Sequence, residues 1–448
     1  MMNAQEKKLY IKTWGCQMNV YDSNRMADVL APLGYKPVEA PEDADMVILN
    51  TCHIREKATD KVFSELGRLR KHQEDKKAKG GKMLMAVAGC VAQAEGDFIM
   101  ERAPYVDMVF GPQTYHELPQ MVMKATGQRV VNTEMPTEAK FDQLPEENKN
   151  QGVTAFLAIQ EGCDKFCTYC VVPYTRGAEF SRNYEGIRDE AKKLIEAGAR
   201  EITLLGQNVN GWHGKDLKGR TIGLGDLIAG LADDVDGLER IRYTTSHPND
   251  MKQDLIDAHK DIPKLMPFLH LPVQAGSNKI LKAMNRSHTV ESYVDIVNEV
   301  KKARPDIAMS SDFIVGFPGE TEEDFEETLK VVKEVTYAFA YSFIFSQRPG
   351  TPAANMGMQI HKAVKSERIQ RLQALLNEQQ LDFNKAQIGK TMPVLFDRKG
   401  SKNGQLHGRT PYNQAIHAEG NERLRGQVVE LEVTEARANS LEGKVAII

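Results

Sequence analysis

The first third of the chain alternates between short apolar runs and segments with helical spacing. Residues 9–15 (LYIKTWG), 45–51 (DMVILNT) and 82–89 (KMLMAVAG) are short and apolar, and each ends in a small residue. Residues 21–34 instead repeat apolar side chains at helical intervals and stop at a glycine. Strands that alternate with helices favour a parallel sheet, so we expect an N-terminal α/β parallel-sheet domain over residues 1–147.

A polar stretch with two prolines, residues 132–151, separates this domain from a second alternating block and is typical of a linker. The strands expected in the second block are 154–160, 201–207, 240–246, 267–273, 307–316 and 339–346. The helices expected there are 184–198, 224–234, 278–285, 290–303 and 321–335. Eight strand–helix units make a full TIM barrel, so six predict a partial (β/α)6 barrel, open on one side, over residues 149–381.

The end of the chain changes in character. Residues 366–388 form a long amphipathic helical pattern with Ile369, Leu372, Leu376 and Phe383 on one face. Beyond it, residues 398–410 are dense in turn residues, and short β-like runs occur at 392–396, 414–418, 427–436 and 444–448. This pattern predicts a small all-β, OB-like barrel over residues 384–448.

Composition narrows the class of protein. Of the 448 residues, 41% are hydrophobic and 27% are charged, which excludes a disordered or fibrous chain. The net charge of −4 means that any nucleic-acid contact depends on local basic patches. The C-terminal part from Asp382 onward carries 10 Lys and Arg against 8 Asp and Glu. Because no apolar run approaches the roughly 20 residues that span a bilayer, and no signal-peptide pattern is seen, we expect a cytoplasmic protein without a membrane.

Three cysteines lie close together at the start of the second block. Cys163, Cys167 and Cys170 form a C-x3-C-x2-C motif just after the first barrel strand, at the mouth where such folds place active sites. Three thiolates on one loop can bind three irons of a 4Fe–4S cluster and leave the fourth iron open. A zinc site is the alternative, but it needs a fourth ligand, and the closest histidine in sequence is His213.

The other three cysteines are far apart in sequence but share a context. Cys16, Cys52 and Cys90 each follow an apolar strand and one small residue. In a parallel sheet all three would emerge at the carboxyl edge, where ligands bind, and could form a second three-cysteine cluster site. Three buried structural cysteines remain the alternative. In a reducing cytosol, either interpretation is favoured over three disulfides.

These features together resemble a known family. A C-x3-C-x2-C motif on a partial barrel is similar to the radical S-adenosylmethionine enzymes. With the N-terminal cysteine domain and the C-terminal β-barrel, the whole chain resembles the radical S-adenosylmethionine methylthiotransferases, whose β-barrel is a TRAM domain. The matching segments are 11–30, 50–58, 109–114, 170–177, 204–210, 243–248 and 269–286. Two segments are less typical of the family: GWHGKD (211–216) and the dipeptide Arg182–Asn183. Both bear on the detailed shape of the pocket.

The resemblance implies a substrate and a set of cofactors. It implies methylthiolation of carbon 2 of N(6)-isopentenyladenosine at position 37 of tRNA, with two 4Fe–4S clusters and S-adenosylmethionine. One S-adenosylmethionine would donate a methyl group to sulfur at the auxiliary cluster of Cys16, Cys52 and Cys90. Another would give a 5′-deoxyadenosyl radical at the cluster of Cys163, Cys167 and Cys170. An electron-donor protein and a sulfur donor are the further partners expected.

Two other functions stay open. The first is a methylthiotransferase that acts on threonylcarbamoyl-adenosine in tRNA or on an aspartate of a ribosomal protein. The second is an RNA-binding protein whose clusters serve structure or redox sensing. Cleavage of S-adenosylmethionine under reduction distinguishes the enzymes from a binding protein.

The resemblance also implies cofactor contacts at the ends of two barrel strands. Gly206, Gln207 and Asn208 match the usual contact with the methionine amino group. Asp312 and Gly316, with Gly319, match the segment that packs against adenine. Ordinary strand-to-helix turns explain the two glycines equally well.

Several other polar residues have competing interpretations. Acids at Glu320, Glu322, Glu323 and Asp324 are typical of a helix N-terminus rather than of catalysis. His270 is either a functional strand-end residue or a hydrogen-bonded core histidine. The candidate RNA contacts on the TRAM-like barrel are Arg398, Lys399, Lys402 and Arg409, with Tyr412 for base stacking. The basic stretch 68–82 is better explained as a solvated helix face.

Overall fold

The computed structural model describes residues 6–52, 58–136, 140–145 and 152–446. The chain divides into two compact units. The first comprises Met1–Asn150, Glu161–Asp164 and Cys170–Phe180, and the second comprises Gln151–Gln160, Lys165–Tyr169 and Ser181–Ile448. The predicted boundary near residue 147 lies outside the described residues, and the predicted domain ranges stay predictions.

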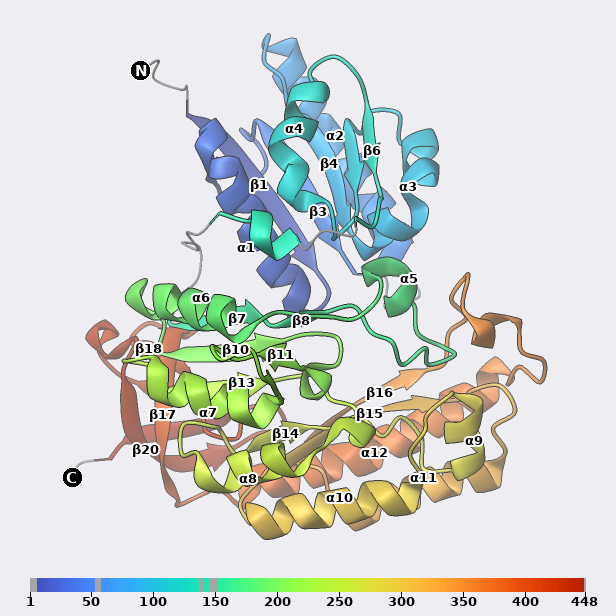
Figure 1. The fold of residues 1–448 in the computed structure, drawn as a ribbon, viewed down its shortest axis with the longest axis vertical. Coiled ribbons are helices and arrows are strands. Elements are labelled where there is room, and N and C mark those ends of the chain that lie inside the picture. Colours follow the sequence, from blue (N-terminus) through green and yellow to red (C-terminus); the bar gives the residue numbers. More distant parts are fainter. Residues whose placement is uncertain (1–5, 53–57, 137–139, 146–151, 447–448) are drawn as a thin grey trace. The chain divides into compact units, whose positions relative to one another are not determined.

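The first unit contains a six-stranded, fully parallel sheet in the order β2-β1-β3-β4-β5-β6 (Figure 1). The strands are β1 Lys7–Trp14, β2 Tyr35–Pro37, β3 Met46–Thr51, β4 Leu84–Gly89, β5 Met108–Phe110 and β6 Val130–Asn132. The α-helices are α1 Gln17–Leu30, α2 Ala58–Ala78, α3 Cys90–Arg102, α4 Leu118–Lys124 and α5 Val172–Arg176. Every residue of β3 and β4 is buried, as expected for central parallel strands that are covered on both faces.

The second unit contains six parallel barrel strands. They form two three-stranded sheets, β7-β10-β13 and β14-β15-β16, which an isolated bridge between Ile241 and Leu265 connects. The strands are β7 Thr154–Ala158, β10 Glu201–Leu205, β13 Arg240–Tyr243, β14 Phe268–His270, β15 Ala308–Val315 and β16 Phe339–Ile344. Within the described residues β7 and β16 do not pair, so the predicted open (β/α)6 barrel is confirmed.

Helices cover this barrel along its outside (Figure 1). They are α6 Tyr184–Glu196, α7 Leu224–Asp234, α8 Gln253–Asp261, α9 Asn278–Ala283, α10 Val290–Ala303, α11 Glu322–Val335 and α12 Lys362–Lys385. In α12 the side chains of Ile369, Leu372 and Leu376 are buried, which confirms the predicted apolar face. The sequence analysis did not predict α8, although its buried residues Leu255, Ile256, Ala258 and His259 lie at helical spacing.

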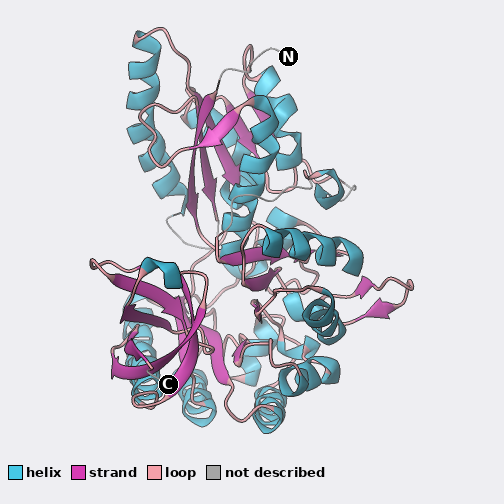
Figure 2. Ribbon diagram, turned by 90° about the vertical axis from the view of Figure 1, so that its left-hand side faces the viewer, coloured by secondary structure: helices cyan, strands magenta, loops and turns pink. Residues whose placement is uncertain are grey.

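The C-terminal part of the second unit is a closed five-stranded barrel in the order β17-β18-β19-β21-β20 (Figure 2). Its strands are β17 Thr391–Lys399, β18 Gln405–Arg409, β19 Ala415–Glu419, β20 Val428–Ala436 and β21 Leu441–Val445. The strand β18 lies in the stretch that we interpreted as turns. A Cβ atom on Gly408 of that strand would lie 2.7 Å from the Leu395 carbonyl oxygen, so here glycine permits close strand approach rather than a turn.

Two buried arginines on β13 attach this small barrel to the larger one within the second unit. Arg240 donates hydrogen bonds to the carbonyl oxygens of Arg409 (2.9 Å) and Pro393 (2.8 Å). Arg242 donates to those of Pro411 and Thr410, both at 2.8 Å, and pairs with Glu201 at 3.0 Å. All of these acceptors on the small barrel are main-chain atoms.

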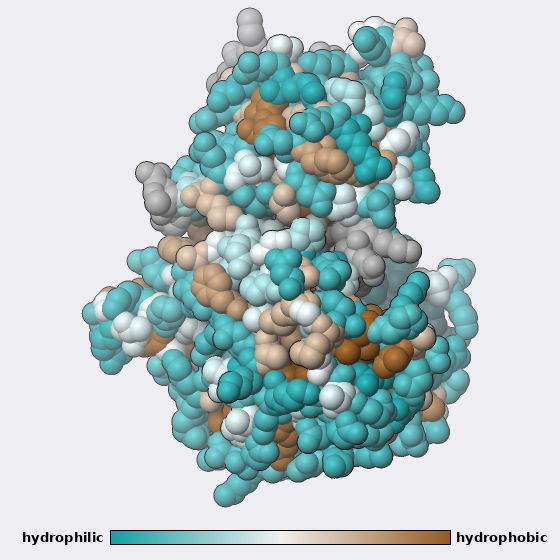
Figure 3. Space-filling model, turned by 90° about the vertical axis from the view of Figure 1, so that its right-hand side faces the viewer, coloured by the Kyte–Doolittle hydropathy of each residue, from teal (hydrophilic) through white to brown (hydrophobic). Residues whose placement is uncertain are grey.

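The surface gives no sign of a membrane segment in the part of the chain that is described. No helix there is long and apolar enough to cross a bilayer. The face drawn in Figure 3 is mostly hydrophilic, with apolar residues in small separate groups.

Candidate functional site: two groups of three cysteines

The three N-terminal cysteines meet at one edge of the sheet in the first unit. Cys16 is the N-cap of α1 just beyond β1, Cys52 follows β3, and Cys90 begins α3 directly after β4. Because β1, β3 and β4 are neighbouring parallel strands, their carboxyl ends lie side by side. The Cys52 thiol hydrogen-bonds to the thiols of both Cys16 and Cys90. The sequence therefore correctly predicted where these cysteines emerge.

Close packing at this edge depends on two glycines. Gly15 has φ 121°, and a Cβ atom there would lie 2.2 Å from the Cβ atom of Cys52. Gly89 has φ 87°, and a Cβ atom there would lie 2.5 Å from the Thr51 carbonyl oxygen. Only glycine adopts such backbone angles without strain and leaves the space that the cysteines need.

The thiols are unequal in acidity. A hydrogen bond from the Cys52 thiol lowers the pKa of Cys16 to about 7 and that of Cys90 to about 6, and the positive charge of Arg176 also lowers both. Burial opposes the shift at Cys90, which is the buried one of the two. The same hydrogen bonds and burial raise the pKa of Cys52 well above its ordinary value. The thiolate, which is the form that binds metal, is therefore favoured at Cys16 and Cys90 over Cys52.

This donor set fits an iron–sulfur cluster better than a single ion. Among the described residues no group of three or more His, Cys, Asp or Glu side chains could hold one metal ion. A 4Fe–4S cluster distributes its thiolates over different irons, so it does not need three ligands around one point. Three cysteines at one edge suit three irons of such a cluster.

A buried group of four charged side chains, which we call the charge cluster, lies beside these cysteines in the same unit. It consists of Asp22, Lys140, Glu161 and Arg176, all at most 3% exposed. Arg176 donates to Asp22 Oδ2 at 2.6 Å and to Glu161 Oε1 at 2.7 Å. Lys140 lies 2.6 Å from Glu161 Oε1 and 3.8 Å from Asp22 Oδ1. Burial raises the pKa of the Asp22 carboxyl, and the two cations oppose that shift.

Sequence analysis missed the charge cluster. Lys140 lies in the stretch that we interpreted as a linker, and Arg176 and Asp22 lie in segments that we used only for the family resemblance. A charged residue in sequence is normally exposed, so its burial cannot be seen without the tertiary fold.

The barrel cysteines follow β7 and the short strand β8 Gln160–Glu161. In the first unit Cys163 and Cys170 are half-buried, and the Cys163 amide donates to the Gly177 carbonyl oxygen at 3.2 Å. In the second unit Cys167 is buried, with Arg286 Nη1 at 3.8 Å from its sulfur. The backbone of Thr168 hydrogen-bonds to Met284 and Ala353, which holds this part of the loop.

The predicted contacts of Gly206, Gln207 and Asn208 lie directly after β10. The Gln160 side-chain oxygen accepts from the amides of Gln207 (2.9 Å) and Asn208 (3.0 Å). Asn208 donates to Asp250 at 2.7 Å, and Asp250 pairs at 2.7 Å with Lys165 of the cysteine loop. The buried Asn208 Oδ1 atom has no hydrogen-bond partner, so an acceptor is left available here.

The second predicted cofactor segment, on and after β15, combines a half-buried acid with a tight turn. Asp312 lies 3.6 Å from His270 Nε2, and its Oδ1 atom has no partner. Gly316 and Gly319 have φ values of 72° and 80°. These angles bear out the turn interpretation of the glycines and do not test a contact with adenine.

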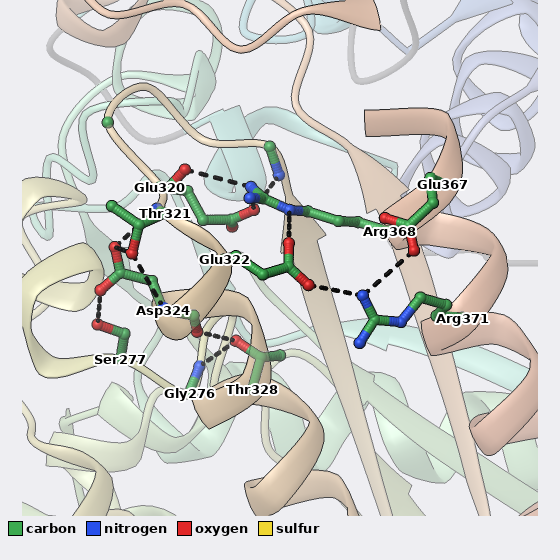
Figure 4. Close-up of polar contacts among 12 residues, drawn as sticks. Gly276, Ser277, Glu320, Thr321, Glu322, Asp324, Thr328, Glu367, Arg368 and Arg371 are labelled. Atoms are coloured by element: carbon green, nitrogen blue, oxygen red, sulfur yellow. Dashed lines mark hydrogen bonds and ion pairs between the residues drawn. The ribbon is translucent and has the colours of Figure 1, made fainter. Parts of the chain in front are cut away.

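The acids that follow this turn cap α11 (Figure 4). Thr321 is the N-cap, and it exchanges hydrogen bonds with Asp324 in a capping box. Glu320 is different, because it is buried, accepts from the Gly316 amide and pairs with Arg368 at 2.8 Å. Glu322 pairs with Arg368 at 3.2 Å and with Arg371 at 2.6 Å. The capping interpretation is therefore confirmed for Asp324, and Glu322 and Glu323 lie in the first turn as expected. It is wrong for Glu320, which precedes the N-cap and pairs with Arg368.

The remaining candidates differ in exposure. His270 is half-buried, and its Nδ1 atom lies 2.9 Å from Ser310 Oγ, so it is hydrogen-bonded on the barrel strands. Arg398, Lys399 and Lys402 are exposed on the small barrel. Tyr412 is half-buried and packs edge-to-face against Phe383, with ring centroids 5.8 Å apart. The half-buried Arg409 donates to the Asn413 carbonyl oxygen.

The basic stretch 68–82 lies largely on α2, as the sequence analysis favoured. Arg70 pairs with Glu74 at 2.8 Å, and Lys76 pairs with Asp45 at 2.6 Å. The motif around Cys52 continues into residues 53–57, which lie outside the described residues.

Comparison with known protein families divides the chain into three matches. Residues 8–111 match the uncharacterized protein family UPF0004, residues 157–332 match the radical SAM superfamily, and residues 385–446 match the TRAM domain. The radical SAM match implies S-adenosylmethionine and a 4Fe–4S cluster as cofactors.

Two curated relatives match the chain over nearly its full length. The tRNA-2-methylthio-N(6)-dimethylallyladenosine synthase of Sphingopyxis alaskensis is 57% identical over 442 residues, which covers 98% of each chain. The protein of the same name from Maricaulis maris is 57% identical over 450 residues, or 99% of this chain and 98% of its own.

Solved structures share the fold at low identity. The cobalamin-dependent S-adenosylmethionine radical enzyme OxsB matches with a TM-score of 0.54 and 13% identity, over 83% of this chain and 56% of its own. The radical S-adenosylmethionine methyltransferase TsrM from Kitasatospora setae matches with a TM-score of 0.55 and 11% identity, over 78% of this chain and 74% of its own. At such identity the likeness concerns the fold alone.

Proposed function

Because the chain belongs to the family of tRNA-2-methylthio-N(6)-dimethylallyladenosine synthases, we propose that it converts N(6)-isopentenyladenosine at position 37 of tRNA into its 2-methylthio derivative. The reaction replaces the hydrogen on carbon 2 of the adenine by a methylthio group. That C–H bond gives polar catalysis nothing to act on, which explains the use of a radical. The observation that carries the proposal is the convergence of Cys16, Cys52 and Cys90 at one sheet edge, in a chain that also has the barrel motif.

We propose that Cys163, Cys167 and Cys170 hold the radical-forming 4Fe–4S cluster. When bound together with S-adenosylmethionine, this cluster supplies the 5′-deoxyadenosyl radical. The chain's own residues hold the thiolates and orient the cofactor. The free oxygens of Asn208 and Asp312 support contacts with S-adenosylmethionine, since each is an acceptor without a protein partner. Gly206, Gln207 and Gly316 form the backbone around those two residues.

We propose a second 4Fe–4S cluster at Cys16, Cys52 and Cys90. The lowered pKa of two of these thiols supports metal binding at neutral pH. The charge cluster supports it further, because Arg176 hydrogen-bonds to Cys90 and brings a positive charge to the thiolates. Within the charge cluster Lys140 and Arg176 share Glu161 and Asp22, so two cations face two carboxylates.

The substrate is a tRNA, and the TRAM domain offers exposed cations for it. We propose that Arg398, Lys399 and Lys402 bind its phosphates. Carbon 2 becomes reachable when the base is splayed out of its loop. The reaction also requires an electron-donor protein and a sulfur donor, and we propose the cytoplasm as its location because the tRNA substrate is used there.

Nucleoside mass spectrometry tests the proposal. Anaerobically reconstituted protein is incubated with S-adenosylmethionine, a reductant and tRNA that carries isopentenyladenosine. We expect a new nucleoside in which one hydrogen is replaced by a methylthio group. Unchanged tRNA with 5′-deoxyadenosine still formed would contradict the proposed acceptor. Threonylcarbamoyl-adenosine tRNA and ribosomal protein, tested in parallel, would then identify the alternative.

A further inference from the structure

A buried arginine beside the barrel motif lacks an acidic partner. Arg286 follows α9 and is 8% exposed. Its Nη1 atom lies 3.8 Å from the sulfur of Cys167, and its Nη2 atom donates to the Pro272 carbonyl oxygen. Its Nε atom is buried without a partner. Within the described residues Arg286 makes no ion pair with any Asp or Glu, so no described carboxylate balances the guanidinium charge.

The groups around Arg286 do not offset that charge. Burial, and next the charge of Arg286, lower the pKa of His247 to about 2. The same two causes lower the pKa of His288 to about 3. Both imidazoles are therefore neutral at physiological pH. Lys165, the other cation near His247, is already paired with Asp250. A buried unpaired charge is strongly unfavourable, so something else must compensate it in the working protein.

The other cysteine group provides a direct contrast. Arg176 also hydrogen-bonds to a cysteine, but Asp22 and Glu161 bind it directly. The same kind of side chain is thus balanced by carboxylates at one cysteine group and left unbalanced at the other. The difference indicates that the anion for Arg286 comes from outside the chain's own carboxylates.

We propose that Arg286 is the counter-charge of the iron–sulfur cluster at Cys163, Cys167 and Cys170, a positioning residue that acts through the Cys167 thiolate. The inference rests on the proposed assignment of that cluster to these cysteines. A cluster on three thiolates is anionic and becomes more so when it is reduced. A fixed positive charge in a dry site therefore favours the reduced state and raises the reduction potential.

The proposal has opposite consequences for the empty and the loaded protein. Without a cluster, Arg286 is an unpaired buried charge, so Arg286→Met should raise the melting temperature of the cluster-free protein. With the cluster bound, the same substitution removes a partner of a ligating thiolate, and such losses lower metal affinity by about 10- to 100-fold. If Arg286 only stabilised the fold, its substitution would not raise the melting temperature of the empty protein and also weaken cluster binding.

The experiment uses the full chain with Cys16, Cys52 and Cys90 all changed to alanine, so that only the barrel cluster remains. We compare this protein with Arg286 unchanged and with the substitutions Arg286→Lys and Arg286→Met. For each we measure the iron content, the melting temperature without iron, and the midpoint potential without S-adenosylmethionine. We expect the methionine variant to bind iron less tightly, to have a more negative potential and to melt higher when empty. The lysine variant should keep most of the potential, because it keeps the charge.

Arg304→Met is the matched control, since Arg304 belongs to the same unit but binds the His259 carbonyl oxygen and Asp306. Its potential should not shift. An unchanged potential in Arg286→Met, with a raised KM for S-adenosylmethionine, would overturn the proposal and assign Arg286 to the cofactor carboxylate. Unchanged values throughout would also overturn it. Cys167→Ala separates the role of Arg286 from the assignment of the cluster to these cysteines. Full iron binding in that variant would refute the cluster assignment.

Discussion

At the scale of single residues, the six cysteines have reciprocal expected roles. Cys163→Ala should abolish formation of 5′-deoxyadenosine, because it removes a ligand of the radical-forming cluster. Cys52→Ala should keep cleavage of S-adenosylmethionine and lose the methylthio product. Each variant is the control of the other, and both products are measured by mass spectrometry. Radical formation by the first variant, or methylthio product from the second, would contradict the assignment.

The charge cluster gives a prediction about stability. Lys140→Met leaves two buried carboxylates with a single cation, and removing one member of a buried ion network typically costs about 3 to 5 kcal/mol. We expect the free energy of unfolding of the first unit to fall by about that amount in urea denaturation. Lys36→Met removes an exposed pair with Glu6 and should change it by less than about 1 kcal/mol. Equal effects would show that the buried network is energetically unimportant.

Some residues could be predicted from the sequence and others could not. The position of the cysteines at the sheet edge follows from strand order, because each comes directly after an apolar run. The charge cluster and Arg286 could not be found in this way, since the sequence gives no sign that their charges are buried. The pairing within the charge cluster depends on Glu161 and Lys140, which local pattern assigns to a strand end and a linker.

At the scale of elements, the start of α11 shows how a cap produces pH dependence. Although burial opposes ionisation, hydrogen bonds from Lys279, Thr321 and Ser277 lower the pKa of Asp324 to about 2. A carboxyl group with a depressed pKa stabilises the fold above its ordinary pKa, and this contribution is lost as the pH falls towards the folded value.

Asp324→Asn should therefore lower the free energy of unfolding at pH 7 by about 1 to 2 kcal/mol. The difference from the parent protein should shrink between about pH 4 and about pH 2. Urea denaturation across this range measures both. Glu323→Gln is the control, because Glu323 lies in the same first turn but is exposed and should have a much smaller effect. A difference that is independent of pH would mean that the carboxylate charge is not what stabilises the cap.

The elements themselves were largely predictable. All six barrel strands were predicted, because each lies in a short stretch with apolar or aromatic side chains next to a helical pattern. Strand β18 was missed because its residues include glycine and polar side chains, and its pairing with β17 and β19 depends on the closed barrel. Local pattern thus predicts strands that carry their own apolar core and misses those that are defined mainly by their neighbours.

At the scale of the whole molecule, the attachment of the C-terminal barrel depends on few side chains. Arg242→Ala removes two hydrogen bonds to that barrel and leaves the buried Glu201 without its 3.0 Å partner. We expect a loss of about 3 kcal/mol, with faster hydrogen exchange over residues 391–445. Arg220→Ala removes an exposed pair with Asp216 and should leave the exchange unchanged. Identical exchange in both variants would rule out a role for Arg242 in docking.

The arginines of β13 bind only carbonyl oxygens of the small barrel, and every residue type offers a carbonyl. Substitutions at Thr410 or Arg409 therefore leave the anchor points in place as long as the backbone keeps its path. Natural variation can alter the exposed side chains of the module without loosening its attachment. Because the anchor points are carbonyl oxygens, a TRAM barrel of different sequence could replace the present one. Arg240 and Arg242 would then bind its backbone in the same way.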